Sequence, residues 1–157
     1  MTAKLDIRLF GGLEVRRDGE LVALPHSKKT RALLGYLILK GTPQRRDALC
    51  ELLWEIPDDP RAALRWSLSK LRPIVNDDDN ERLTADRERV AFERSGAKVD
   101  VVRAEEACAK GLDTISREEL LDICRACGGT LLAGLDLPSQ PAYESWRLGQ
   151  QERARQL

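Results

Sequence analysis

The stretch that decides the fold is RAALRWSLSKLR, residues Arg61 to Arg72. Its apolar residues Leu64, Leu68 and Leu71 recur at the spacing of one face of an α-helix. A second set shares that spacing on another side of the helix axis: Arg61, Arg65, Ser69 and Arg72. The pattern predicts a helix over residues 60–75 that buries one face and presents a cationic face.

The cationic character of this stretch extends to its neighbours. Over the 157 residues the charge is balanced, with 26 Lys and Arg against 26 Asp and Glu, whereas nucleic-acid-binding domains are usually basic. Residues 26–75, however, carry ten basic and five acidic side chains, an excess of five positive charges. Because a local field steers a polyanion more than the sum over the chain does, this segment is the one expected to attract it.

Other features limit the class of protein. No apolar run approaches the ~18 residues of a membrane span, and no signal-peptide pattern opens the chain. We therefore expect a cytoplasmic protein without a membrane partner, whose cysteines are reduced. Cys124 and Cys127 have CxxC spacing, but a second ligand pair is missing and His26 is the only histidine. The four cysteines are predicted to be buried helix thiols, with no metal and no cofactor.

Strand signals open the chain. Residues 5–9 and 13–16 alternate apolar and polar side chains, as half-buried strands do. The dipeptide Asp18-Gly19 is a hairpin signal, and residues 20–24 form a third short strand. Together they predict a small N-terminal antiparallel sheet.

Two helices are predicted between this sheet and the 60–75 helix. The first covers residues 28–40, with Ser27 as its N-cap. The second covers residues 43–54, with Thr42 as cap and Pro43 in its first turn. Trp54 and Trp146, being large aromatic residues, are predicted to lie in the core.

A hairpin is predicted after the third helix, with strands at residues 82–85 and 88–92. Three helices followed by a hairpin is the pattern of a winged helix-turn-helix, in which the third helix can enter a major groove and the hairpin is the wing. The fold class is therefore α+β, with residues 1–95 as a DNA-binding domain. Pro73 is expected to kink the third helix or end it early.

The remaining residues, 96–157, are predicted to be helical. Asp100 would cap a helix that ends at Lys110, and the Ser116…Glu119 capping box opens another. A last helix is predicted over residues 142–157. This segment forms the second predicted domain.

Several motifs, taken in order, resemble the Streptomyces antibiotic regulatory protein (SARP) family. They are LFGGLEV at 9–15, SKKTRALL at 27–34, LCELLW at 49–54, the 61–72 stretch, and residues 131–146 with LDLP at 135–138. The resemblance implies a response-regulator-type winged helix followed by a tetratricopeptide-like bacterial transcriptional activation domain. It also implies binding to promoter DNA, often at direct repeats where a homodimer could sit, and recruitment of RNA polymerase.

The candidate DNA contacts follow from the predicted winged helix. Arg65 is the first choice for a bidentate contact with a guanine edge, and the lysines and arginines around it would hold phosphates. Trp66 could stack on sugar or base edges or equally cover the sheet. The complete candidate set is Lys28, Lys29, Arg31, Arg61, Arg65, Trp66, Ser69, Lys70, Arg72, Arg87 and Arg89.

Two functions compete. The first is a sequence-specific transcriptional regulator, of the activator type, that reads promoter DNA with the 60–75 helix and uses the 82–93 hairpin as wing. The alternative is a protein-interaction module of a larger signalling protein, in which the winged helix is a structural dock. An enzyme is not expected, since no nucleophile has a plausible partnering base.

Overall fold

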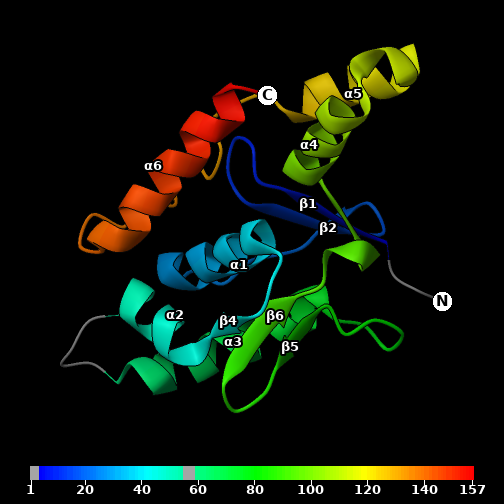
Figure 1. The fold of residues 1–157 in the computed structure, drawn as a ribbon. Helices are drawn as coiled ribbons and strands as arrows, with labels where there is room; N and C mark the ends of the chain where they lie inside the picture. The colour runs from blue at the N-terminus through cyan, green and yellow to red at the C-terminus, as the bar shows by residue number, and fades with distance from the viewer. Residues whose placement is uncertain (1–3, 55–58) are drawn as a thin grey trace.

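The computed structural model describes residues 4–54 and 59–157. Within these ranges the chain forms six α-helices and two small β-sheets, an α+β arrangement. Three helices, α1 (Lys28–Lys40), α2 (Arg46–Leu53) and α3 (Pro60–Val75), lie with the second sheet at one end (Figure 1). The pair α4 (Asp100–Lys110) and α5 (Arg117–Ala126) projects at the other end, and α6 (Pro141–Arg155) lies alongside α1, at the left of the view.

The first sheet has the strand order β3-β2-β1-β7. Strands β1 (Leu5–Arg8), β2 (Glu14–Arg17) and β3 (Glu20–Leu21) pair antiparallel, which confirms the predicted N-terminal sheet. The fourth strand, β7 (Ala97–Val99), is a correction, because it pairs parallel to β1 from the segment predicted to be wholly helical. Three residues are too few to show an alternating pattern, and their partner lies about ninety positions earlier in the sequence.

Helix α1 (Lys28–Lys40) has the predicted ends. The Ser27 hydroxyl accepts a hydrogen bond from the Thr30 N–H at 3.2 Å, and Gly41 closes the helix in the left-handed conformation. Helix α2 (Arg46–Leu53) starts three residues later than predicted. Its expected first turn is instead the short strand β4 (Gln44–Arg45), which pairs with a strand of the hairpin and keeps the chain extended up to the helix.

Helix α3 (Pro60–Val75) has the predicted range. The Asp59 carboxylate accepts from the Ala62 N–H at 3.1 Å, and Pro60 occupies the first turn, where a missing N–H costs nothing. Pro73 does not end the helix early, so that part of the expectation was wrong, and the kink stays a prediction. Pro73 lies in the last turn, so the helix loses only one internal hydrogen bond, and two arginines outside the helix hold the end in place.

The C-terminal end of α3 is held by two guanidinium groups. Arg17, on β2, donates to the carbonyls of Pro73, Ile74 and Asn76 at 3.2, 2.6 and 2.9 Å. Arg82, which is 1 % exposed, donates to the Val75 carbonyl at 2.9 Å and pairs with the Asp77 carboxylate at 3.0 Å. Carbonyls that a helix end leaves without partners are thereby satisfied by positive charges, which also favour the negative end of the helix dipole.

The second sheet has the order β4-β6-β5 and contains the predicted hairpin, β5 (Leu83–Ala85) and β6 (Arg89–Phe92). No glycine occupies the turn. Instead the Asp86 carboxylate accepts from the N–H groups of Glu88 and Arg89, each at 2.8 Å. These two bonds hold the pKa of the Asp86 carboxyl below its usual value, and they build the turn that a glycine often provides.

The C-terminal helices are α4 (Asp100–Lys110), α5 (Arg117–Ala126) and α6 (Pro141–Arg155). The Ser116 cap of α5 is confirmed, since its hydroxyl accepts from the Glu119 N–H. Asp100 differs from its prediction. It is the first residue of α4 rather than its cap, and its buried carboxylate accepts from the N–H groups of Leu9 and Phe10, both at 3.0 Å, as well as from Val101 at 2.7 Å. It therefore ties α4 to the end of β1.

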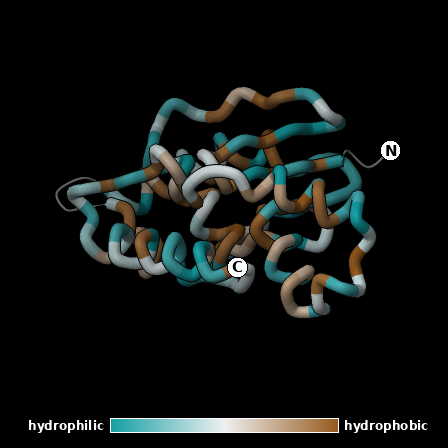
Figure 2. The backbone as a smooth tube through the Cα atoms, turned by 90° about the horizontal axis from the view of Figure 1, so that it is seen from above, coloured by the Kyte–Doolittle hydropathy of each residue, from teal (hydrophilic) through white to brown (hydrophobic). Residues whose placement is uncertain are grey.

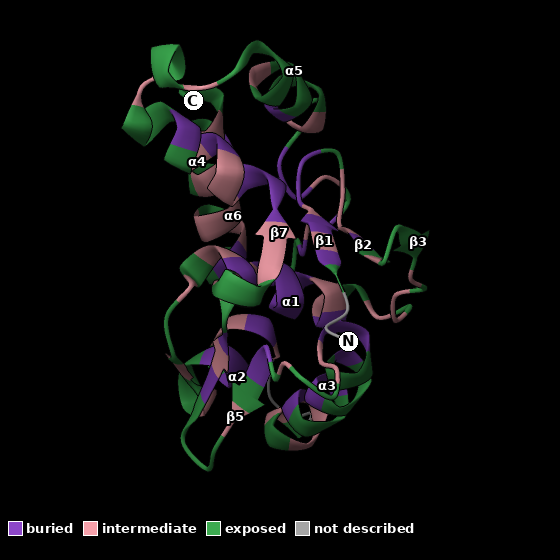
Figure 3. Cartoon of the chain, turned by 90° about the vertical axis from the view of Figure 1, so that its right-hand side faces the viewer, coloured by how far each residue is buried: buried purple, intermediate pink, exposed green. Residues whose placement is uncertain are grey.

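One hydrophobic core joins the N-terminal elements to the connector before α6. It includes Leu131, Leu132, Leu135 and Leu137, and Tyr143 on α6 is fully buried in it. Trp54 and Trp146 pack at its edge and are partly buried. Helix α5 remains largely exposed (Figure 3).

The predicted division of the chain into two domains, between residues 95 and 96, stays a prediction. In the structure this position falls inside the 3-10 turn η1 (Arg94–Gly96).

The cysteines differ from their prediction. Cys50 is buried, but Cys108 near the end of α4 and Cys124 on α5 are exposed, and Cys127 after α5 is half-buried, because other described elements cover little of these parts of the two helices. All four are free thiols.

Figure 2 shows hydrophobic and hydrophilic stretches following one another along the helices. In the described ranges, no helix combines the length and apolar character needed to cross a membrane.

The first prediction concerns Arg17. Arg17→Ala should lower the free energy of unfolding by about 1.5–3 kcal/mol, because it removes a charged donor from carbonyls at the end of α3. Urea denaturation followed by circular dichroism measures the loss. Arg16→Ala is the matched control, since Arg16 is exposed and its side chain contacts only near neighbours in the described sequence, the Glu14 carboxylate and the Gly19 carbonyl; it should change the stability by less than ~0.5 kcal/mol. Equal losses in the two variants would contradict the role of Arg17.

The second prediction concerns Asp100. Asp100→Ala should destabilise the protein by more than ~2 kcal/mol, because it leaves buried N–H donors at the end of β1 without an acceptor. Hydrogen exchange should show faster exchange of the Leu9 and Phe10 amides in the variant. Exchange as slow as in the wild type would show that these amides do not depend on the carboxylate.

Candidate nucleic-acid interface

The cationic face of α3 points outward. Arg61, Arg65, Ser69 and Arg72 are all exposed, and the leucines of the opposite face are buried. Since Ser67 is buried and its hydroxyl lies 2.9 Å from that of Thr30 on α1, the rotation of α3 is also fixed by a polar contact. The helix therefore presents its guanidinium groups to solvent and keeps its apolar residues in the core.

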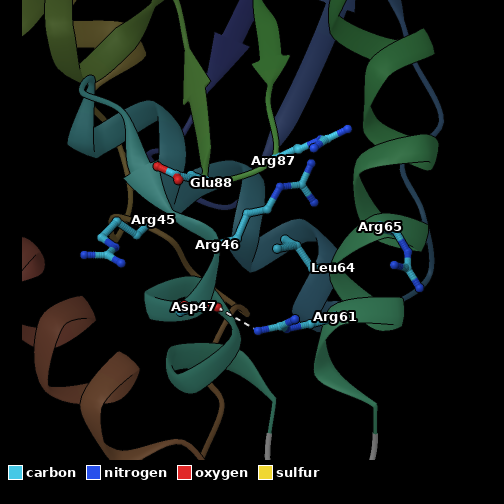
Figure 4. Close-up of a pocket in the computed structure, with 8 residues that line it drawn as sticks. All are labelled: Arg45, Arg46, Asp47, Arg61, Leu64, Arg65, Arg87 and Glu88. Atoms are coloured by element: carbon cyan, nitrogen blue, oxygen red, sulfur yellow. Dashed lines mark hydrogen bonds and ion pairs between the residues drawn. The ribbon is translucent and has the colours of Figure 1, made fainter.

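A cleft of about 340 Å³ opens beside the first turns of α3 (Figure 4). Arg61, Leu64 and Arg65 line it from α3, and the turn of the β5–β6 hairpin contributes Arg87 and Glu88. The remaining wall is the junction of β4 and α2, with Arg45, Arg46 and Asp47. Three elements that are separate in the sequence thus enclose one concave, polar surface.

The cleft is electropositive. Five arginines and two acids line it, which leaves three positive charges in excess. Asp47 lies 3.5 Å from Arg61, but both side chains are mostly exposed, so this ion pair is weak. Among the described residues, no carboxylate comes within 4.0 Å of the guanidinium groups of Arg46, Arg65 or Arg87. The field of these groups is therefore open to an external anion.

Arg45 and Arg46 were missed by the sequence analysis. They contribute to the local excess of positive charge, but the helix was predicted to begin at Pro43, which placed both inside its first turns. The extended conformation of β4 places them at the edge of the cleft instead. The adjacent pair of arginines just before a helix was the available signal.

Trp66 is 49 % exposed, and the Lys70 ammonium lies 5.6 Å from the centre of its ring. About half of the Trp66 side chain is therefore open to a partner, as stacking on a sugar or base edge would need. Lys70 is itself exposed on the same helix.

Other candidate residues lie outside the cleft. Lys28 pairs with Asp136 at 3.5 Å, and Arg31 donates to the His26 carbonyl at 3.4 Å, at the start of α1. Lys29 is half-buried on the same turn. Arg89 lines a separate hollow along the hairpin. The structure thus brings Arg61, Arg65 and Arg87 of the predicted set together and leaves the α1 group apart from them.

Comparison with known proteins gives a likeness to a solved structure. No family model matches the chain, and no curated protein matches its sequence significantly. Among solved structures it is similar to EmbR of Mycobacterium tuberculosis, determined in complex with a low-affinity phosphopeptide, with a TM-score of 0.71 and 25% sequence identity. The match covers 97% of this chain and 43% of EmbR, so the chain spans less than half of that protein's length. EmbR is a SARP-family regulator, and the chain has a SARP-like fold.

Proposed function

We propose that the protein is a DNA-binding transcriptional regulator of the SARP type. In this proposal α1–α3 and the β5–β6 hairpin form a winged helix-turn-helix over residues 1–95. Residues 96–157 begin a tetratricopeptide-like activation domain. The single observation that carries the proposal is the exposed cationic face of α3, which continues into an electropositive cleft beside the hairpin turn. The likeness to a SARP-family regulator over nearly the whole chain supports it.

Helix α3 is suited to the major groove. Its 16 residues give a length of about 24 Å, and its exposed residues, apart from Trp66 and Pro73, are cationic or polar. Arg65 is central on the exposed face, where a guanidinium could bind the N7 and O6 atoms of guanine at once. Arg61, Ser69, Lys70 and Arg72 would flank it and contact bases or phosphates. Trp66 would pack against a sugar or a base edge.

The hairpin and α1 would hold the backbone. Arg87 and Arg89 extend from the hairpin, where a wing reaches the phosphates or the adjacent minor groove. Lys28, Lys29 and Arg31 lie at the start of α1, where phosphate contacts would add affinity without reading sequence. By the same resemblance we propose promoter sites with direct repeats, a homodimer on the DNA and recruitment of RNA polymerase as the mode of activation.

The third prediction tests base reading by α3. Binding-site selection on the purified protein should return a consensus sequence, and Arg65→Ala should lose about 1–3 kcal/mol of discrimination at one base pair of it. Fluorescence anisotropy with the selected duplex and its single-base variants measures this. Arg117→Ala, which removes the same charge from an exposed site on α5, should leave the discrimination unchanged.

Two results would count against the proposal. If the wild-type protein does not bind any duplex at low salt, the helices serve as a dock for another protein. If Arg65→Ala and Arg117→Ala weaken binding equally and without sequence preference, α3 does not read bases through Arg65.

A further inference from the structure

We infer that the cleft between α2, α3 and the hairpin is a binding site for one phosphate of the DNA backbone, held by Arg46 and Arg87. The inference rests on the proposed function and adds a defined anchoring point to it. It also assigns a role to Arg46, which the sequence pattern did not single out.

Arg46 is fixed in position by the hairpin. Its backbone N–H donates to the Glu88 carbonyl at 2.8 Å, and its side-chain Nε donates to the Asp86 carbonyl at 2.7 Å. The second bond occupies the side-chain Nε–H and leaves the two terminal guanidinium nitrogens available to an anion. Because the side chain is already ordered, binding an anion would cost little rotamer entropy.

Arg87 approaches from the turn of the hairpin. Arg87 and Arg46 line the same cleft, and in the view of Figure 4 no drawn carboxylate lies between their guanidinium groups. Asp47 is paired with Arg61 instead, at 3.5 Å, and the Glu88 carboxylate points away from both groups (Figure 4). Two positive charges that line one cleft repel each other, and an anion between them would turn this repulsion into attraction.

A phosphate diester matches the site in chemistry and shape. Guanidinium groups bind phosphate oxygens through paired N–H donors, and these charge-assisted bonds are about twice as strong as neutral ones. The cleft of about 340 Å³ is concave but open to solvent, so one phosphate of a nucleic-acid strand could enter it while the strand continues outside.

The consequence for recognition is a fixed register. A phosphate held between the α2 junction and the hairpin turn would set how far α3 enters the groove before any base is read. Arg46 and Arg87 would therefore contribute equally to binding of all sequences, in contrast to Arg65.

The fourth prediction compares arginines inside and outside the cleft. The double variant Arg46→Gln/Arg87→Gln should lower the slope of log affinity against log salt by about 0.9, the value for one neutralised phosphate on duplex DNA, and each single variant should lower it by less. Arg117→Gln is the control, because it removes the same charge from an exposed site on α5 outside the cleft, so it should change the slope much less. The probe is a labelled mixed-sequence duplex, with affinities measured by fluorescence anisotropy over a series of salt concentrations.

Thermal unfolding of each variant separates binding from folding. Arg87 forms no side-chain hydrogen bond in the described ranges, so Arg87→Gln tests the site even if loss of the Arg46–Asp86 bond loosens the hairpin. Slopes that fall equally for the cleft variants and the control, or for none of them, would overturn the phosphate site and leave the proposed function standing. A wild-type protein that binds no duplex, or that binds only a phosphopeptide, would overturn both.

Discussion

The arrangement of the candidate interface depends on how the end of α3 is held. A helix end leaves carbonyl groups without partners. At the end of α3, Arg17 from the first sheet and Arg82 from the start of the hairpin satisfy the carbonyls of Pro73, Ile74 and Val75 with positive charge. Arg17 precedes α3 in the sequence and Arg82 follows it. Together they attach the end of α3 to both sheets.

This constraint explains why the exposed residues of α3 and the hairpin turn form one surface. Arg82 leads directly into β5, and its position fixes where the hairpin starts relative to α3. Strand β4 then joins the hairpin and delivers Arg46 to the cleft. A chain with no excess charge overall therefore concentrates positive charge where three elements meet. The field that a polyanion would encounter is set by topology more than by composition.

The elements with strong local signals could be predicted from the sequence. Helix α3 has a leucine face, an Asp-Pro start and enough length to show the period, and its range was correct. The parts that failed depend on pairing between distant residues. Strands β4 and β7 are too short to show a pattern of their own and exist because a partner strand is present. Arg46 became visible as a site residue only through β4, and the exposure of Cys124 depends on how little α5 is covered. The face of α3 was predictable, and the cleft beside it was not.

Strand β7 also bears on where this chain can be divided. It pairs with the edge of β1 opposite to β2, and the adjacent Asp100 carboxylate accepts hydrogen bonds from the amides that follow β1. A shorter protein that ended after residue 95 would keep the three helices and the hairpin but would expose a row of backbone donors and acceptors along β1. Such an open sheet edge invites strand-to-strand association between molecules. A soluble minimal fragment therefore needs to extend through the first turn of α4.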